Sequence, residues 1–462
     1  MQNLTDRLKK AAGKIWKNIW TLLIGLLSLG LVLSVIWPDF SFSQTENRSL
    51  AGFPSISAKT LWNGEAGKSF ESYAQDQFPG RDLFFHLNYI IRKLSGQSKI
   101  QDVYLGHGAL YSAPDNLSQE ILDENRQALD NLAASSDFPV SVMVCPGAAS
   151  VQKERLPYQA FFTDEVQKVN EMNSQLALAK PVSLTDLLSQ QKDQYIFYKT
   201  DHHWTSDLAG QAAGLYMNQA HPEDGYSIDQ FENMPVSDSF MGTLASASGS
   251  CFLKDTICIR PWISQKDNPY VVTWADGSKT TSIYNTKALS QKDQYQVFLG
   301  ANQSVVSIDT MADNDRNLLI LKDSYANSMI QFLLPYYRSI TIVDPRYCMD
   351  DLSKIINRYG INEILAVYSC ETLMSDTSLK TMLAEFASQA AEGQNDQNAQ
   401  EENSEDSGQG SSSESSEDQE SSQEDGTEEQ NQSEDQNNEP DQAADPGSDH
   451  NAEGGDNPSA DQ

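Results

Sequence analysis

The sequence predicts an α/β sandwich built on a mostly parallel sheet. Short apolar runs bounded by turn residues are typical of buried parallel strands, and amphipathic helical patterns alternate with them. The strands are expected at residues 140–144, 317–321, 340–343 and 363–367, and the helices at residues 118–135, 163–179, 205–219 and 325–334.

The chain begins with a basic segment, residues 1–18, and an apolar run at residues 19–37. A helix over the apolar run would be about 28 Å long, close to the hydrocarbon thickness of a bilayer. The basic flank favours a cytoplasmic N-terminus and a single transmembrane anchor. A cleaved signal peptide is the alternative, but the run is long for one and no small-residue cleavage site follows Pro38.

The chain ends in an acidic segment, residues 388–462, of polar and small residues. Residues 391–462 hold 23 of the 65 acids and no Lys or Arg, which leaves 42 acids against 32 bases elsewhere. Such a composition buries too little apolar surface to fold, so we expect a disordered tail. The tail is either a solvated extension or a polyelectrolyte that binds cations or spaces the wall, and the acidic balance argues against nucleic-acid binding.

Between these ends, residues 38–387 are expected to form one extracytoplasmic domain. Residues 226–310 change to β-branched and aromatic runs with turn signals such as Asp276-Gly277, which indicates a strand-rich insertion. Five cysteines include Cys251 and Cys258, whose spacing suits either a hairpin disulfide or two free thiols. No cysteine spacing indicates a structural zinc site.

The segment Asp201-His202-His203-Trp204 carries the main chemical signal. In an extended segment, residues i and i+2 face the same side, so Asp201 can orient His203 as in a hydrolase triad. Ser324 follows an apolar strand and begins a helical pattern, where a serine hydroxyl projects over a parallel sheet.

Each of these residues also has a structural interpretation. A histidine beside tryptophan is often a packed, hydrogen-bonded residue, and a serine at a helix start often acts as an N-cap. In an extended segment His202 would point away from His203, so a metal site at this pair is not expected.

Several motifs together resemble the DHHW proteins, a branch of the SGNH-hydrolase-like superfamily similar to the alginate O-acetylation proteins. The resemblance covers roughly residues 45–380 and rests on Glu46-Asn47-Arg48, Asp76-Gln77-Phe78-Pro79-Gly80-Arg81, Asp201-His202-His203-Trp204, Asp323-Ser324-Tyr325-Ala326-Asn327 and Asp344-Pro345-Arg346-Tyr347. It implies an SGNH-like three-layer sandwich with Asp201, His203 and Ser324 as a catalytic triad. The order Asp, His, Ser is permuted relative to the usual SGNH order.

The resemblance also implies a function at the cell surface. We expect an O-acyltransferase or esterase acting on acetyl groups of a cell-surface polysaccharide, without a cofactor or metal. Because acetyl-CoA is not present outside the cell, transfer would need a multispan membrane partner that hands over acyl groups. Lesser candidates for substrate or oxyanion binding are Asn327, Gly300, Asn302, Arg81 and Arg346. The alternative is a non-catalytic polysaccharide-binding or envelope-assembly protein that retains the fold.

Overall fold

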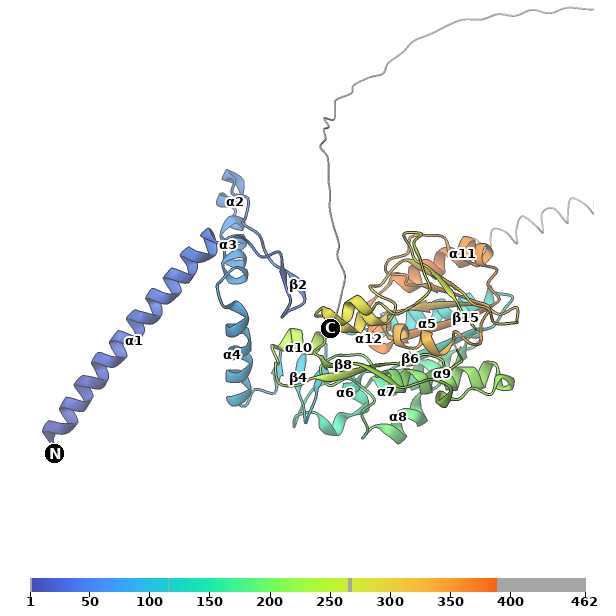
Figure 1. Cartoon of the computed structure of the whole chain (residues 1–462), viewed down its shortest axis with the longest axis horizontal. Coiled ribbons are helices and arrows are strands. Elements are labelled where there is room, and N and C mark those ends of the chain that lie inside the picture. Colours follow the sequence, from blue (N-terminus) through green and yellow to red (C-terminus); the bar gives the residue numbers. More distant parts are fainter. Residues whose placement is uncertain (1, 115, 265–267, 389–462) are drawn as a thin grey trace, which may run out of the picture. The chain divides into compact units, whose positions relative to one another are not determined.

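The structure is a computed structural model that describes residues 2–114, 116–264 and 268–388 (Figure 1). The predicted tail lies outside the described residues except for Ser388, and so do the side chains of residues 2–15 in the predicted cytoplasmic segment.

A single long helix, α1 (Gln2–Ile36), opens the chain. Within it, Trp16–Ile36 has a mean hydropathy of 2.5 over its most apolar window and is long enough to cross a membrane. Its side chains are almost all exposed to the surroundings of the protein. By length and composition the helix suits either a membrane anchor or a signal sequence.

Further α-helices and strands follow within the described residues. The helices are α2 (Ala58–Trp62), α3 (Glu65–Asp76), α4 (Arg81–Leu94), α5 (Gln119–Ala134), α6 (Ala148–Val151), α7 (Glu165–Gln175), α8 (Thr185–Gln191), α9 (Ser206–Ala220), α10 (Thr243–Ser248), α11 (Leu352–Tyr359) and α12 (Cys370–Ser375). The strands are β1 (Phe42–Ser43), β2 (Arg48–Ser49), β3 (Lys99–Ile100), β4 (Val103–Leu105), β5 (Leu110–Ser112), β6 (Val140–Cys145), β7 (Lys180–Pro181), β8 (Met234–Phe240), β9 (Asp255–Ile259), β10 (Val271–Thr273), β11 (Lys279–Thr280), β12 (Val305–Asp309), β13 (Asn317–Lys322), β14 (Ser339–Val343) and β15 (Glu363–Ser369).

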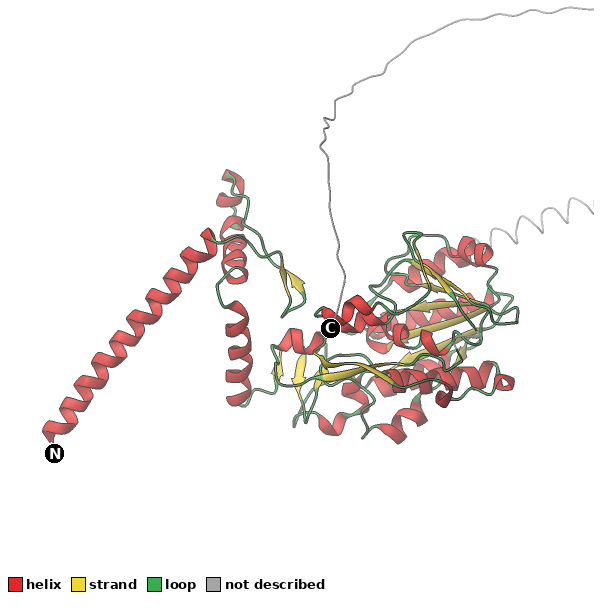
Figure 2. Cartoon of the chain, viewed as in Figure 1, coloured by secondary structure: helices red, strands yellow, loops and turns green. Residues whose placement is uncertain are grey.

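An eight-stranded sheet in the order β11-β10-β12-β14-β13-β15-β6-β7 organises the domain (Figure 2). The five strands from β14 to β7 are parallel, and β12, β10 and β11 extend one edge in antiparallel fashion. Strand β13 is central, with Leu319 paired to Thr341 of β14 and to Ile364 of β15. Its apolar run is buried on both faces, as expected of a covered parallel strand. The predicted α/β class with a mostly parallel sheet is confirmed.

Helices cover both faces of the sheet and complete three layers. On one face α9 packs Leu208, Ala212 and Met217 against strand residues that include Ile320 and Ile340. On the other face α5, α7, α11 and α12 pack against the opposite side chains of the same strands. The helix α9 is rich in small residues because the packing is tight: a Cβ on Gly210 would lie 2.7 Å from the ring of Phe332.

The region between α9 and β13 contributes strands to two sheets. Strands β8 and β9 form a separate antiparallel pair with bulges, whereas β10 and β11 form a hairpin that joins the main sheet through β12. Cys251 and Cys258, for which a disulfide and free thiols were both open, are unpaired, as are the other three cysteines.

The segment after β13 differs from the predicted helix over residues 325–334. It forms two short 3-10 helices, η7 (Ser324–Ser328) and η8 (Ile330–Phe332). The carboxylate of Asp323 accepts the backbone N–H of Tyr325 at 2.9 Å and fixes a tight first turn. Tyr, Asn and Ser have modest helix propensity, and the buried contacts of this segment favour the irregular path over a regular α-helix.

Candidate active site

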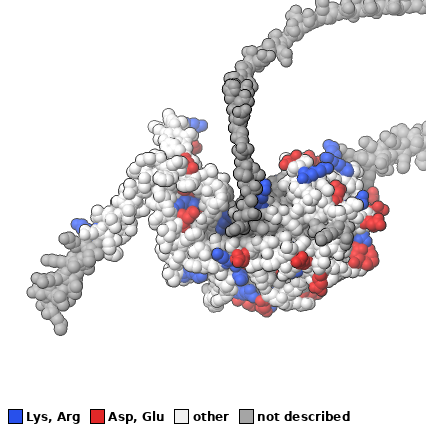
Figure 3. Space-filling view, viewed as in Figure 1, with Lys and Arg blue, Asp and Glu red and all other residues white. Residues whose placement is uncertain are grey.

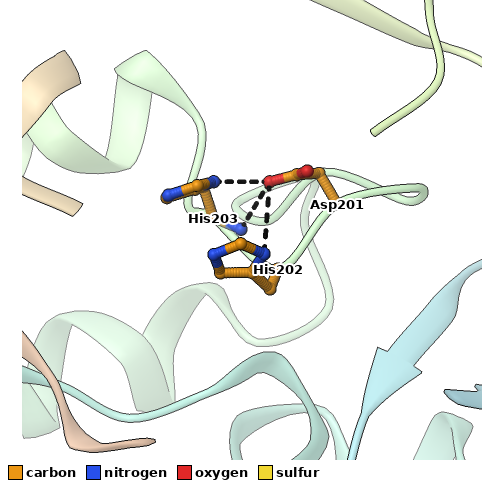
Figure 4. A group of neighbouring side chains, drawn as sticks. All are labelled: Asp201, His202 and His203. Carbon is orange, nitrogen blue, oxygen red and sulfur yellow. Dashed lines mark hydrogen bonds and ion pairs between the residues drawn. The ribbon is translucent and has the colours of Figure 1, made fainter. Parts of the chain in front are cut away.

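The Asp201–His203 segment is a bend, so the predicted extended conformation is wrong. The bend lies between Phe197 and Trp204, which form an isolated antiparallel bridge. Within it the backbone N–H of His203 donates to Oδ1 of Asp201 at 3.1 Å, as in the local turns that Asp side chains favour. The same oxygen lies 2.5 Å from Nδ1 of His203. The two side chains therefore meet through a turn and not through strand alternation (Figure 4).

Ser324 completes a chain of three hydrogen-bonded side chains. Its Oγ lies 2.8 Å from Nε2 of His203, although the two residues are 121 positions apart. Ser324 begins η7 directly after β13, and the capping acceptor of η7 is Asp323. The N-cap interpretation of Ser324 therefore does not hold, and its hydroxyl is directed to the imidazole.

A cradle of hydrogen-bond donors holds the Asp201 carboxylate. Oδ2 accepts the backbone N–H of Thr243 at 2.8 Å and its hydroxyl at 3.0 Å. The preceding residue is Gly242, where a Cβ would lie 2.2 Å from the same oxygen. A side chain at position 242 is therefore incompatible with the observed position of the carboxylate.

A second buried carboxylate fixes the backbone just before the bend. Asp255, at the start of β9, accepts the N–H groups of Lys199 and Thr200, both at 2.8 Å, and the Thr200 hydroxyl at 2.5 Å. The same hydroxyl accepts the N–H of Gly242 at 3.0 Å. Asp255 thus positions both the bend and the cradle of Asp201.

The protonation states suit a base directed at Ser324. Burial alone would raise the pKa of Asp201, but the charges of His203 and His202 and the hydrogen bonds from His203 and Thr243 hold it below its ordinary value. Burial lowers the pKa of His203, and the charge of His202 lowers it further, against the opposing effect of Asp201. At neutral pH Asp201 is therefore ionised and His203 is a neutral base.

His202 does not point away from His203 as the extended segment predicted. The bend brings the two rings within 3.9 Å of each other, centroid to centroid, and His202 Nδ1 lies 2.8 Å from the Thr243 hydroxyl. Asp201, His202 and His203 place ligand atoms within 4.8 Å of one another, so they are the group in the described chain that could hold a metal. The Asp201 to His203 hydrogen bond already occupies two of those atoms and favours proton transfer over metal binding.

Three aromatic side chains lock the histidine loop against the serine turn. Tyr295 stacks on the His203 ring at 3.8 Å, and its hydroxyl donates to the Ser324 carbonyl at 3.2 Å. The indole N–H of Trp204 donates to the Tyr325 carbonyl at 2.9 Å, and the Tyr325 hydroxyl donates to the His202 carbonyl. These reciprocal contacts hold the two loops in one relative position.

The other predicted residues lie in two separate networks. Asn302 accepts from the buried ammonium of Lys322 at 2.9 Å and from the Asn327 amide at 3.4 Å. Burial lowers the pKa of Lys322 to about 8. Gly300 takes a positive φ of 73° and donates its N–H to Gln296, which leaves no free donor there.

Both predicted arginines are already paired with acids. Arg346 forms an ion pair with Asp344 at 2.7 Å, beside Lys322. Arg81 pairs with Glu46 and donates to the Ser43 hydroxyl at 3.1 Å, in the N-terminal part of the domain. The structure does not bring either arginine to Ser324 through any described contact.

Thr243, Gly242, Asp255 and Tyr295 are the site residues that the sequence did not reveal. They lie in the strand-rich region, 41 to 94 positions after Asp201, and no spacing or periodicity connects them to the bend. Only the contacts of the folded chain identify them.

Comparison with known proteins agrees with this architecture. A family profile described as "DHHW protein" matches residues 117–343, which confirms the sequence resemblance over that segment. No curated protein matches the chain. A DHHW family protein from Eubacterium siraeum has 21% sequence identity and a TM-score of 0.50, covering 60% of this chain and 97% of its own. Bacillus cereus PatB1 with a sulfonyl adduct has 18% identity and a TM-score of 0.51, covering 60% and 96%.

The chain therefore shares its fold with these two proteins, and residues 117–343 match the DHHW family profile. A lower structural similarity, with a TM-score of 0.40 and 15% identity, is found to the O-acetyltransferase domain of Pseudomonas putida AlgJ. It covers 63% of this chain and 99% of that domain.

The close approach at Gly242 gives a direct prediction. In Gly242→Ala the new methyl group would displace the Asp201 carboxylate, so we expect kcat/KM for an acetyl ester to fall by about 100-fold, as for a misplacement of about 1 Å. The matched control is Gly67→Ala on α3, where a Cβ meets nothing within 4 Å and no loss is expected. Equal activities in the two variants would contradict the cradle.

Proposed function

We propose that this protein is a membrane-anchored, extracytoplasmic O-acyltransferase or esterase that acts on acetyl groups of a cell-surface polysaccharide. The observation that carries the proposal is the continuous hydrogen-bonded chain from Ser324 Oγ through His203 to Asp201, with distances of 2.8 and 2.5 Å. A hydroxyl beside a neutral imidazole that is itself oriented by a carboxylate is the arrangement used for nucleophilic acyl transfer.

The geometry suits a two-step reaction through an acyl-serine. Ser324 Oγ attacks the acyl carbonyl while His203 Nε2 takes the hydroxyl proton, and Asp201 stabilises the imidazolium that forms. The tetrahedral intermediate collapses when the imidazolium returns the proton to the leaving oxygen. In the second step His203 removes a proton from the acceptor hydroxyl, which attacks the acyl-serine and releases Ser324.

The acceptor decides between the two reactions. Water as acceptor gives an esterase, and a sugar hydroxyl gives an O-acyltransferase. The apolar segment Trp16–Ile36 supports a location at the membrane, with the domain on its outer side. There a multispan membrane partner would supply the acyl groups, because a domain outside the membrane has no access to cytoplasmic acetyl-CoA.

The nucleophile is tested by hydrolysis of 4-nitrophenyl acetate. The Ser324→Ala variant of the full chain in detergent should lose at least about 1,000-fold in kcat, as in serine hydrolases that lose a triad residue. Ser290→Ala, at an exposed serine whose hydroxyl bonds only to the Lys287 carbonyl, is the control and should keep wild-type activity. Retained activity in Ser324→Ala would exclude the proposed nucleophile.

The protonation of His203 predicts the pH profile. Because its pKa is lowered in the folded protein, the base stays neutral below pH 6.5, and kcat/KM should fall only at more acidic pH. Since the charge of His202 contributes to this lowering, His202→Gln should move the acidic limb to higher pH. The measurement is kcat/KM for 4-nitrophenyl acetate between pH 4 and 8. An acidic limb at the same pH in His202→Gln and in the wild type would contradict the effect of His202 on the pKa of His203.

A further inference from the structure

A small cavity lies beside Thr243, which holds the Asp201 carboxylate, on the side of the N-terminal hairpin. It has a volume of about 300 Å³ and lies between the turn that joins β1 to β2 and the helix α10. Its lining includes Glu46, Asn47, Arg48, Gln101, Thr243 and Ser246. Thr243 also donates to Asp201 and contacts His202, so the cavity and the triad share one wall residue.

A buried hydroxyl in this cavity has no protein partner. Ser246 is 4% exposed, and its Oγ makes no hydrogen bond to any described residue. A buried polar group without a partner is unfavourable and rare in folded proteins, and a bound molecule that supplies the partner is one reason to keep it. Because Ser246 lines the cavity, a molecule bound there is placed to supply the missing partner.

Two strained backbone positions line the same cavity. Asn47 has a φ of 54° and Gln101 a φ of 50°, and they are two of the four non-glycine residues with positive φ in the described chain. Such conformations are unfavourable for residues with a Cβ and persist where the surrounding contacts impose them, often at ligand sites. Neither side-chain amide has a hydrogen-bond partner among the described residues.

An ion-pair network holds the hairpin in place. Arg48 binds Asp76 of α3 at 2.6 Å and Glu46 at 2.5 Å, and Arg81 of α4 binds Glu46 and the Ser43 hydroxyl. On the other side, His86 of α4 lies 2.8 Å from the Gly249 carbonyl, just after α10. The cavity is thus bounded by two anchored elements.

The remaining groups select for a neutral, hydroxyl-rich ligand. The guanidinium of Arg48 is paired with Glu46 and Asp76, and the carboxylate of Glu46 is paired with Arg48 and Arg81, so neither offers an unpaired charge. What remains unpaired is two amides and one hydroxyl, which both donate and accept hydrogen bonds. A cavity of about 300 Å³ is at the small end of ligand sites. This combination matches one sugar ring.

We propose that this cavity is an acceptor subsite that binds one sugar ring of the polysaccharide, with Ser246, Asn47 and Gln101 as its hydrogen-bonding groups. The proposal rests on the proposed function, because the sugar ring is taken to be the acceptor of the acyl group. It also assigns a role to the Glu46-Asn47-Arg48 and Asp76–Arg81 motifs, which the triad does not use. They build and brace the wall of the subsite.

Binding can be measured without turnover by saturation-transfer NMR on the full chain in detergent. The probes are glucose, galactose, mannose, N-acetylglucosamine and N-acetylgalactosamine, each titrated to 50 mM. We expect at least one to give a saturable signal. Ser246→Ala and Asn47→Gly should each weaken the binding of that sugar by roughly five-fold, because each variant loses one hydrogen-bonding group. Glycine at position 47 keeps the positive φ of the backbone. Ser250→Ala removes another buried, unpaired hydroxyl outside the cavity and should bind as wild type.

The same titration with Ser324→Ala separates this proposal from the proposed function. Binding that persists in Ser324→Ala and is weakened in Ser246→Ala supports the subsite, whether or not the ester is hydrolysed. No saturable signal from any of the five sugars, or equal binding in wild type, Ser246→Ala and Asn47→Gly, would overturn the subsite. If the binding data overturn the subsite, a loss of ester hydrolysis in Ser324→Ala alone would still support Ser324 as the nucleophile.

Discussion

The buried carboxylate of Asp201 is the constraint on which the site depends. An anion removed from water is stable only where donors replace its hydration, and this one accepts from the backbone and ring of His203 and from both donors of Thr243. The bend at residues 201–203 and the absence of a side chain at Gly242 follow from that requirement. The orientation of His203 is thus set by how the carboxylate is satisfied.

The sheet supplies the second fixed point. Ser324 follows β13, the central strand, and the neighbouring Asp323 accepts the N–H of Ser369 at 2.9 Å and its hydroxyl at 2.6 Å, which joins the ends of β13 and β15. Trp204 and Tyr325 then join the histidine loop to the serine turn. The distance from Ser324 to His203 is therefore held by contacts on both sides, as preorganised acyl transfer requires.

On the face drawn in Figure 3, Lys and Arg lie among Asp and Glu over the described residues. Arg48, Arg81 and Arg346 each form an ion pair with an acid. The cavity beside α10 differs because its unpaired groups are neutral. This contrast is the reason to assign a sugar, and not an anion, to that position.

The parts of the fold and site with a regular signature could be predicted from the sequence. The apolar runs identified the central strands, and the acid and histidine near one another suggested a relay to a serine after β13. Local periodicity could not reveal the bend, because an Asp and a His two positions apart can meet in an extended strand and also in a turn stabilised by the Asp side chain. It also could not reveal the 3-10 turns after Ser324 or the roles of Thr243 and Tyr295, which depend on contacts between distant segments.

The most direct test of the triad is mass spectrometry of the full chain after treatment with phenylmethylsulfonyl fluoride. We expect one adduct on Ser324 in the wild type and a much slower reaction in His203→Ala. An unmodified Ser324 in the wild type, or equal reaction rates in the two proteins, would contradict the triad.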